Sequence, residues 1–379
     1  MNRLTSLVVL LTVTACSTEP SSDGADTDVV DTTPTDTTDT TDTTDTTDTT
    51  DTTDTTDSDD TGDTASGETG DTALVETGDT GSSDTGDTAV KDTGPVIDTG
   101  PDWCAIGPNA APYTWTTING LSGAEDFDID EFGRFIAVNG GDLLAQDPVA
   151  MTTTLLAVNV GQSTSGTRIL PNGDVAVAKP SNGSIVRIDV NTGTKTTIFS
   201  GLNYPNGMEI DDLGYIYVSE QSANRVRQIN PNNGNDWIIA TGLNNPNGII
   251  FDDDYDTLYA NSFGGGTVWR IERTGTHTFD PPVVHAQTPS GYGSYDGLNI
   301  DVCDYVYVTD FGPGIVWRIH PNGTVDQAAN LPAGWIPNMR WGNGVNGWDP
   351  LRLYVSNIGG GTLFGLDVGI PGKPPVYFP

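Results

Sequence analysis

Basic residues, histidine, cysteine and long apolar runs are all scarce in this sequence. Its 379 residues include 15 Lys and Arg against 52 Asp and Glu, with three His and three Cys. This acidic balance argues against a nucleic-acid partner, which would need a basic face. The sequence also lacks the Gly-x-Ser-x-Gly, His-Glu-x-x-His and Cys-x-x-Cys motifs. Serine-hydrolase and zinc-site interpretations therefore have no support.

The N-terminus has the pattern of an export signal. Arg3 is followed by an apolar run at 7–11 that is too short to span a bilayer, and then by Val-Thr-Ala-Cys ending at Cys16. These four residues resemble the bacterial lipobox, so we expect a lipid on Cys16 and a signal peptide over residues 1–16. Ser17 then favours the outer membrane or cell surface. A plain signal peptide with a nearby cysteine is the alternative.

Residues 17–102 predict a disordered spacer. From Ser17 to Gly100 there are 24 Asp or Glu residues and one base, Lys91, and most of the other residues are Thr, Gly and Ser. Too few apolar groups are present to offset the conformational entropy of folding, and like charges extend the chain. Weak binding of divalent cations and an O-glycosylated stalk are alternatives to a solvated tether.

Residues 103–379 contain an internal repeat. The related segments 204–211, 245–252 and 295–301 each lead through a turn into strands in which β-branched and aromatic residues alternate. Three weaker copies begin near residues 125, 165 and 338, and the equivalent glycines 166, 207 and 248 are spaced by 41 residues. Repeats of about 40 residues with four short strands are typical of propeller blades. We therefore predict an all-β, six-bladed β-propeller over residues 103–379, and we expect a monomer.

The segment 115–121 predicts how the ring closes. It has the form of a fourth strand but precedes the first blade, so we expect it to complete the last blade and leave no sheet edge open. The C-terminal residues 376–378 are a further candidate for that edge. A seventh degenerate blade and an open sandwich are the alternative folds.

The repeat register predicts which side chains meet at one mouth of the central channel. Counting back from the turn after each innermost strand, and aligning the Pro-Asn segments, gives one residue per blade. These are Glu125, Ser165, Asn206, Asn247, Asp296 and Asn338. Carboxylate and amide oxygens are the donors that Ca²⁺ prefers, and two carboxylates would repel one another without a cation. We predict a Ca²⁺ site; the alternative is that Asn-Gly and Asp-Gly are ordinary turn dipeptides.

Short motifs around these positions resemble a known family. Residues 122–126, the Pro-Asn-Gly repeats at 205–207 and 246–248, and the Asp-Gly at 296–297 are similar to calcium-dependent six-bladed lactonases of the gluconolactonase, regucalcin and paraoxonase type, with NHL-like repeats. The resemblance implies Glu125, Asn206, Asn247 and Asp296 as Ca²⁺ ligands. The histidine pair of the paraoxonases has no counterpart, because the register puts His277, His285 and His320 in outer strands or turns.

Two functions remain open at this point. The first is Ca²⁺-dependent hydrolysis of a lactone or related ester, with Asp296, or a neighbouring carboxylate, taking a proton from water. Loop positions on the same face give candidates for the substrate pocket: Lys179, Glu220, Asn261, Asp310, Asn338 and Asn357. The second is a non-catalytic propeller that binds a protein or glycan at the cell envelope; a metal-free propeller like strictosidine synthase is a weaker third.

The two remaining cysteines form a possible pair. If Cys16 carries lipid, Cys104 and Cys303 lie in an oxidising compartment. By strand direction both fall on the face opposite the predicted metal site, in adjacent blades. A disulfide and two free thiols are both consistent with this placement.

Overall fold

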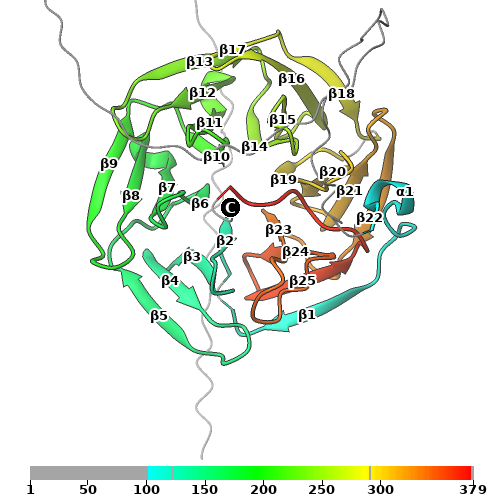
Figure 1. The fold of residues 1–379 in the computed structure, drawn as a ribbon, viewed down its shortest axis with the longest axis horizontal. Coiled ribbons are helices and arrows are strands. Elements are labelled where there is room, and N and C mark those ends of the chain that lie inside the picture. The colour runs from blue at the N-terminus through cyan, green and yellow to red at the C-terminus, as the bar shows by residue number, and fades with distance from the viewer. Residues whose placement is uncertain (1–100, 122, 290–291, 377–379) are drawn as a thin grey trace, which may run out of the picture. The chain divides into compact units, whose positions relative to one another are not determined.

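The computed structural model describes residues 101–121, 123–289 and 292–376, and the fold below concerns these residues. The predicted signal peptide, Cys16 and nearly all of the predicted spacer lie outside them. Short strands with buried, alternating apolar side chains form six antiparallel sheets arranged around a central channel, so the domain is a six-bladed β-propeller (Figure 1). No helix among the described residues is long and apolar enough to cross a membrane.

The first three blades are regular, and each contributes its first strand to the channel wall. Blade one contains β2 (Phe127–Ile129), β3 (Phe135–Asn139), β4 (Asp142–Gln146) and β5 (Thr153–Ala157). Blade two contains β6 (Thr167–Ile169), β7 (Val175–Lys179), β8 (Ser184–Ile188) and β9 (Lys195–Ser200). Blade three contains β10 (Pro205–Ile210), β11 (Ile216–Glu220), β12 (Arg225–Ile229) and β13 (Asp236–Thr241).

Blade four carries an additional hairpin. It contains β14 (Pro246–Phe251), β15 (Thr257–Ser262), β16 (Thr267–Gly275), β17 (Thr278–Phe279) and β18 (Val283–Gln287). Blade five contains β19 (Tyr295–Ile300), β20 (Val306–Asp310), β21 (Ile315–Ile319) and β22 (Val325–Asn330). One α-helix, α1 (Trp103–Ile106), and two short 3₁₀ turns, η1 (Pro180–Asn182) and η2 (Gln221–Ala223), complete the helical content of the described residues.

Blade six combines strands from the two ends of the domain. It contains β23 (Met339–Trp341), β24 (Arg352–Asn357), β25 (Thr362–Asp367) and β1 (Trp115–Asn119). Antiparallel pairing joins β1 to β25, with Thr117 opposite Phe364. In Figure 1 the cyan β1 accordingly lies along the outer edge of the red and orange strands of this blade.

The hydrophobic core is divided among the gaps between blades. Six apolar clusters are buried, and each takes side chains from two neighbouring blades. At the junction of blades six and one, Trp348 is 1% exposed and donates from its indole to the Gly133 oxygen at 2.8 Å. Since each blade buries apolar surface against both neighbours, stability depends on the complete ring.

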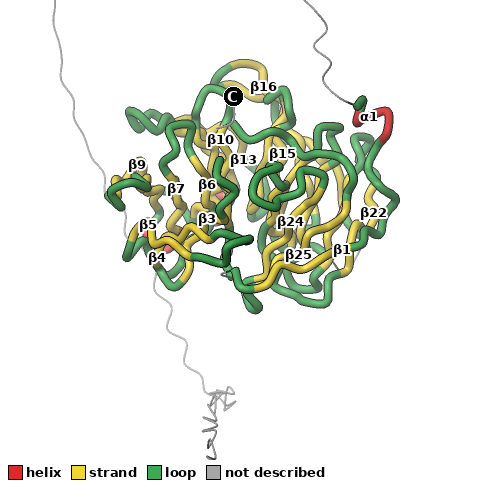
Figure 2. The backbone as a smooth tube through the Cα atoms, turned by 60° about the horizontal axis from the view of Figure 1, so that its bottom comes forward, coloured by secondary structure: helices red, strands yellow, loops and turns green. Residues whose placement is uncertain are grey.

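The two faces of the ring carry different features. We call the face on which the innermost strands begin the site face, and the other the opposite face. The turns after the innermost strands, including Cys303, and the C-terminal segment 371–376 lie on the opposite face. Figure 2 shows α1 and the C-terminal segment on the same side of the ring.

Candidate functional site

One mouth of the channel is lined by the six residues that the register predicts. Each lies at or just before the start of an innermost strand, and their burial ranges from partial for Glu125 to 4% exposure for Asn247. Asn206-Gly207, Asn247-Gly248 and Asp296-Gly297 lie within β10, β14 and β19 rather than in turns. The turn interpretation of these dipeptides is therefore wrong.

Close packing of the innermost strands explains the glycines. A Cβ on Gly248 would lie 2.5 Å from the backbone oxygen of Asp296, and a Cβ on Gly297 would lie 2.6 Å from the Cα of Asn338. Both distances are too short for any side chain. The glycines thus let neighbouring strands approach at the mouth, which sets the separation of the polar residues beside them.

The two carboxylates at the mouth, Glu125 and Asp296, both have raised pKa values. Burial and the charge of Asp126 raise the pKa of Glu125 to about 7. Burial and the charge of Glu125 raise the pKa of Asp296 well above its ordinary value, while a hydrogen bond from Asn247 opposes the shift. Among the described residues, neither carboxylate takes part in a salt bridge.

Other polar residues of the mouth already make hydrogen bonds within the protein. The Nδ2 of Asn206 lies 3.5 Å from the side-chain oxygen of Gln221, so its amide oxygen is available to a ligand. Ser165 donates to the Pro205 oxygen at 3.0 Å. By contrast, the side-chain oxygen of Asn338 accepts from Arg340 at 3.0 Å, which makes Asn338 a poorer donor to a metal.

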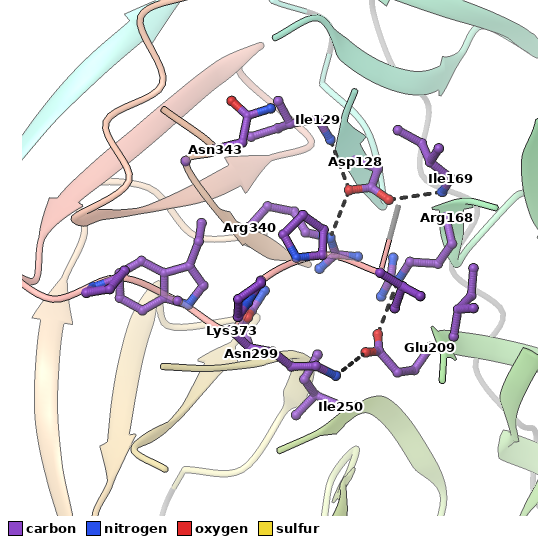
Figure 3. A pocket seen from close by; sticks show the side chains of 18 of the residues that line it. Asp128, Ile129, Arg168, Ile169, Glu209, Ile250, Asn299, Arg340, Asn343 and Lys373 are labelled. Carbon is purple, nitrogen blue, oxygen red and sulfur yellow. Dashed lines mark hydrogen bonds and ion pairs between the residues drawn. The ribbon is translucent and has the colours of Figure 1, made fainter. Parts of the chain in front are cut away.

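Deeper in the channel, acidic and basic side chains balance. Asp126 accepts from Arg168 at 2.5 Å and from Arg340 at 2.9 Å, and so joins blades one, two and six. Further along (Figure 3), Glu209 lies 3.0 Å from Lys373, and Asp128 lies 4.0 Å from Arg340. Among the described residues of this layer, three carboxylates thus face three cations, whereas Glu125 and Asp296 form no salt bridge with a described residue.

The donor set at the mouth fits Ca²⁺ rather than a metal that prefers nitrogen or sulfur. Within the part of the chain that the structure describes, no group of three or more His, Cys, Asp and Glu is placed to hold a metal. Glu125, Asp296, Asn206 and Asn247 instead offer two carboxylates and two amide oxygens, which are hard donors. Their combined charge would neutralise one divalent cation.

Two residues predicted to line a substrate pocket are buried and make hydrogen bonds within the protein. Glu220 is fully buried and accepts from Arg225 at 2.6 Å and Arg227 at 2.7 Å. Asp310 is also fully buried and accepts from the Ser294 amide and the Trp317 indole. Both carboxylates are held by contacts within the protein, and their role in a substrate pocket stays a prediction.

The other pocket candidates differ among themselves. Asn357 donates to the Gly334 oxygen at 2.6 Å in the loop between β22 and β23, and Lys179 is half-buried at the end of β7. Asn261 is fully buried, accepts from the Gly248 amide at 3.0 Å and donates to the Asp296 oxygen at 2.8 Å. Asn261 therefore positions the backbone of Asp296, and a contact with a ligand stays a prediction.

The sequence interpretation missed the charged layer inside the channel. Asp128, Arg168 and Glu209 lie three residues after Glu125, Ser165 and Asn206, so the same register could have found them. The repeat register does not predict Arg340 or Lys373 as members of this layer. The three histidines lie away from the mouth; His277, for example, stacks on Trp237 with ring centroids 3.7 Å apart.

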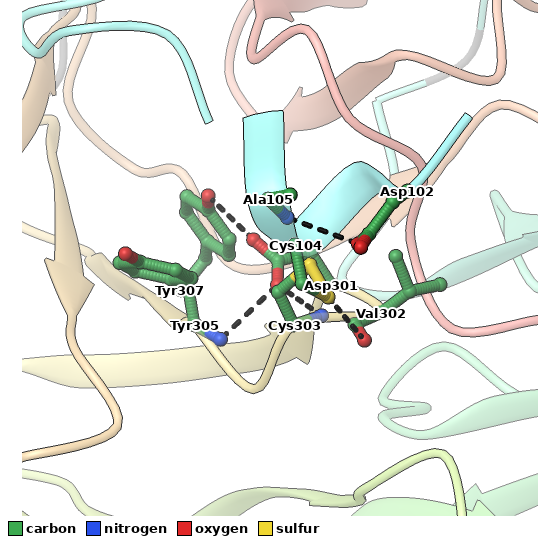
Figure 4. The surroundings of a disulfide bond; sticks show 8 residues. All are labelled: Asp102, Cys104, Ala105, Asp301, Val302, Cys303, Tyr305 and Tyr307. Atoms are coloured by element: carbon green, nitrogen blue, oxygen red, sulfur yellow. Dashed lines mark hydrogen bonds between the residues drawn. A yellow bond between two sulfur atoms is a disulfide. The ribbon is translucent and has the colours of Figure 1, made fainter. Parts of the chain in front are cut away.

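Cys104 and Cys303 form a disulfide across 199 residues of sequence (Figure 4). Asp102 caps α1 by accepting from the Ala105 amide at 3.0 Å, and Cys104 lies in this helix. On the other side, Asp301 holds the turn by accepting from the Cys303 amide at 2.9 Å. The disulfide therefore fastens the segment before blade one to the opposite face of blade five.

Part of the chain matches the sequence model of a known family, and solved structures share its fold. Residues 218–358 match the model of the SMP-30/Gluconolactonase/LRE-like region, a stretch that includes Asn247 and Asp296. No curated protein sequence matches the chain.

Three solved structures illustrate the fold. A gluconolactonase from Xanthomonas campestris is 17% identical, with 69% of this chain and 94% of that chain covered and a TM-score of 0.56. Regucalcin from Agrobacterium tumefaciens, a calcium-binding protein, is also 17% identical, with 69% and 95% covered and a TM-score of 0.52. Virginiamycin B lyase from Staphylococcus aureus is 13% identical, with 67% and 99% covered and a TM-score of 0.51. The chain is thus a six-bladed propeller that is similar to the SMP-30/gluconolactonase family over residues 218–358.

Proposed function

We propose that the mouth binds one Ca²⁺ and that the propeller hydrolyses a lactone or a related ester. The observation that carries this proposal is the pair of carboxylates at the mouth, Glu125 and Asp296, for which the described residues supply no ion-pair partner. Asn206 and Asn247 would complete the protein ligands. The match to a gluconolactonase-like family model over residues 218–358 supports the same reaction class.

Each residue at the mouth has a role in this proposal. When bound, Ca²⁺ would polarise the carbonyl of the ester. Asp296 would take a proton from the attacking water, whose oxygen bonds to the carbonyl carbon. The C–O bond of the ring then breaks, and the alkoxide oxygen receives that proton.

Second-strand residues hold this arrangement in place. Asn261 fixes the backbone of Asp296, and Ser219 donates to the Asn247 oxygen at 2.7 Å. The hydrogen bond between the Asn247 side chain and Asp296 orients the carboxylate. These contacts restrict the motion of two ligands before a cation arrives, which lowers the entropic cost of binding.

Calcium titration of the purified protein by calorimetry tests the metal claim. We expect one Ca²⁺ per chain in the wild type, and at least about 100-fold weaker binding in Glu125→Gln and Asp296→Asn because each removes one of two charges. Glu131→Gln is the matched control, since Glu131 is exposed in the turn after β2. Equal affinity in all four proteins would contradict the site.

The same samples separate catalysis from binding. Calcium binding without turnover of any lactone would favour the non-catalytic propeller, which binds a protein or glycan at the envelope. Hydrolysis that persists in Asp296→Asn would instead remove Asp296 from the reaction.

We also propose that a lipid on Cys16 anchors the chain at the outer membrane or cell surface. Cys16 lies outside the described residues, but the Cys104–Cys303 disulfide supports export, since disulfides persist mainly in oxidising compartments. Partition of the expressed protein into detergent, lost in Cys16→Ser, is the expected result. Partition that does not depend on Cys16 would contradict it.

A further inference from the structure

The C-terminal segment crosses the channel on the opposite face. After β25 the chain leaves blade six, and residues 371–373 pair with blade five. The Val302 amide donates to the Pro371 oxygen at 3.2 Å, and the Lys373 amide donates to the Ile300 oxygen at 3.1 Å. Figure 1 shows this red segment running to the centre of the ring.

The Lys373 side chain enters the channel from this segment and is 4% exposed. Its Nζ lies 3.0 Å from the Glu209 carboxylate and 3.9 Å from the centre of the Tyr255 ring. Figure 3 shows Lys373 and Glu209 joined by a dashed line. The Phe251 ring is 5.8 Å away. A carboxylate combined with aromatic faces is a typical environment for an alkylammonium group.

The residues that surround the Lys373 ammonium group belong to blades three and four, whereas Lys373 follows blade six. Glu209 belongs to β10 of blade three and lies 3.7 Å from Arg168, while Phe251 ends β14 of blade four. Tyr255 adopts a φ of 60°, in the left-handed region that bulky residues rarely occupy. The backbone of Tyr255 is therefore strained at the point where its ring covers the ammonium group of Lys373. Such strain is common at ligand sites.

We propose that Glu209, Tyr255 and Phe251 form a binding site for a primary alkylammonium group, and that Lys373 fills this site as a tethered ligand. The bound lysine latches the C-terminal segment across the channel. Ligands then reach Glu125 and Asp296 only from the site face. A free amine, or the lysine side chain of another peptide, binds the same walls when the latch is lifted. This inference does not depend on the proposed hydrolase activity.

Gly372 packs closely against blade six. A Cβ on Gly372 would overlap the indole ring of Trp341 in blade six. Gly372→Ala therefore dislodges the segment while Lys373 itself is kept, and it provides a second route to the open state.

Lysine reactivity in the wild-type protein gives the first test. Lys373 is enclosed, whereas Lys195 is exposed and donates to the Val158 oxygen. Acetylation followed by mass spectrometry should modify Lys195 at least about tenfold faster than Lys373. Gly372→Ala should raise the rate at Lys373 toward that of Lys195. Equal rates in the wild type would overturn the latch.

Amine rescue gives the second test. Lys373→Ala leaves Glu209 with one cation fewer, and its Tm should fall by about 5 °C or more. Millimolar n-butylammonium should raise the Tm of Lys373→Ala but not that of the wild type, and tetramethylammonium, which cannot donate a hydrogen bond, should have no effect. The double variant with Glu209→Gln should lose the rescue.

Two results would overturn the ammonium site. An unchanged Tm in Lys373→Ala would show that the pair does not hold the latch. A lowered Tm that n-butylammonium and tetramethylammonium raise equally, or not at all, would show that Lys373 acts by packing alone. If Lys373→Ala does not fold, the acetylation rates of Lys373 and Lys195 in the wild type still test the latch.

Discussion

The side-chain amide of Asn261, in the second strand of blade four, donates a hydrogen bond at 2.8 Å to the backbone oxygen of Asp296 in blade five. It also accepts from the Gly248 amide at 3.0 Å. One buried side chain thus links the strand that carries Asn247 to the strand that carries Asp296. Ser165 and Ser219 make similar links to the backbone oxygens of Asn206 and Asn247, so the positions of these candidate ligands depend on the blade before each of them.

Replacing Asn261 should therefore affect calcium as well as stability. Asn261→Ala leaves the Gly248 amide and the Asp296 oxygen without partners in a buried region, at a cost of about 2–3 kcal/mol in the free energy of unfolding. Calcium affinity should fall by about tenfold or more because Asp296 is no longer held. Asn357→Ala is the matched control, since Asn357 is also buried and donates to the Gly334 oxygen in the loop between β22 and β23. If Asn357→Ala lost as much calcium affinity as Asn261→Ala, the loss would be a general effect of destabilisation.

Asp126 should be critical for the junction between the first and last blades. Its carboxylate accepts from Arg168 and Arg340, and Asp126→Asn would leave two buried guanidinium groups poorly compensated. Urea denaturation should show a loss of about 3–5 kcal/mol. Asp212→Asn should cost less than about 1 kcal/mol, because Asp212 is exposed and lies 3.4 Å from Arg273. Similar losses in the two variants would contradict a special role for Asp126.

Asp301 should make the protein more stable in acid. Burial raises its pKa from 3.8 to about 6, although the Cys303 and Tyr305 amides and the Tyr307 hydroxyl oppose the shift. The folded state therefore binds this proton more tightly than the unfolded state. Its contribution is complete below pH 3.8 and is lost as the pH rises through 6, a change of about 3 kcal/mol. Urea titrations at several pH values should show this fall in the wild type and a smaller one in Asp301→Asn; identical profiles would contradict the assignment.

Loss of the disulfide should loosen the start of the domain. Cys104 and Cys303 are 199 residues apart. Replacing both by serine should lower the free energy of unfolding by about 2–5 kcal/mol. Hydrogen exchange should also increase in α1, whose buried contacts are few. An unchanged exchange rate in α1 would show that the helix is held by other contacts.

The parts of the molecule that repeat were the parts that sequence could predict. The blade number and the positions of Asn206, Asn247 and Asp296 follow from copies of one motif, since each copy places its residue at the same point of an innermost strand. Glu220 occupies a loop-like polar position, yet it is buried because Arg225 and Arg227 approach from the adjacent strand. A polar residue type alone did not reveal that pairing.

Contacts between distant segments could not be predicted in this way. Asp126 and Arg340 are 214 residues apart and meet only because the ring brings blades six and one together. Lys373 lies after the last repeat, so no register applies to it. Such pairings depend on the curvature of the whole ring, which local patterns do not specify.

The central claim is that a calcium ion held at Glu125, Asn206, Asn247 and Asp296 supports hydrolysis of a lactone or ester. Its most direct test is the rate of hydrolysis of a panel of lactones by the full-length protein with calcium, after chelation, and after calcium is added back. We predict turnover with calcium, its loss on chelation, and its return when calcium is restored. Turnover that is indifferent to chelation, or no turnover with calcium bound, would contradict the account.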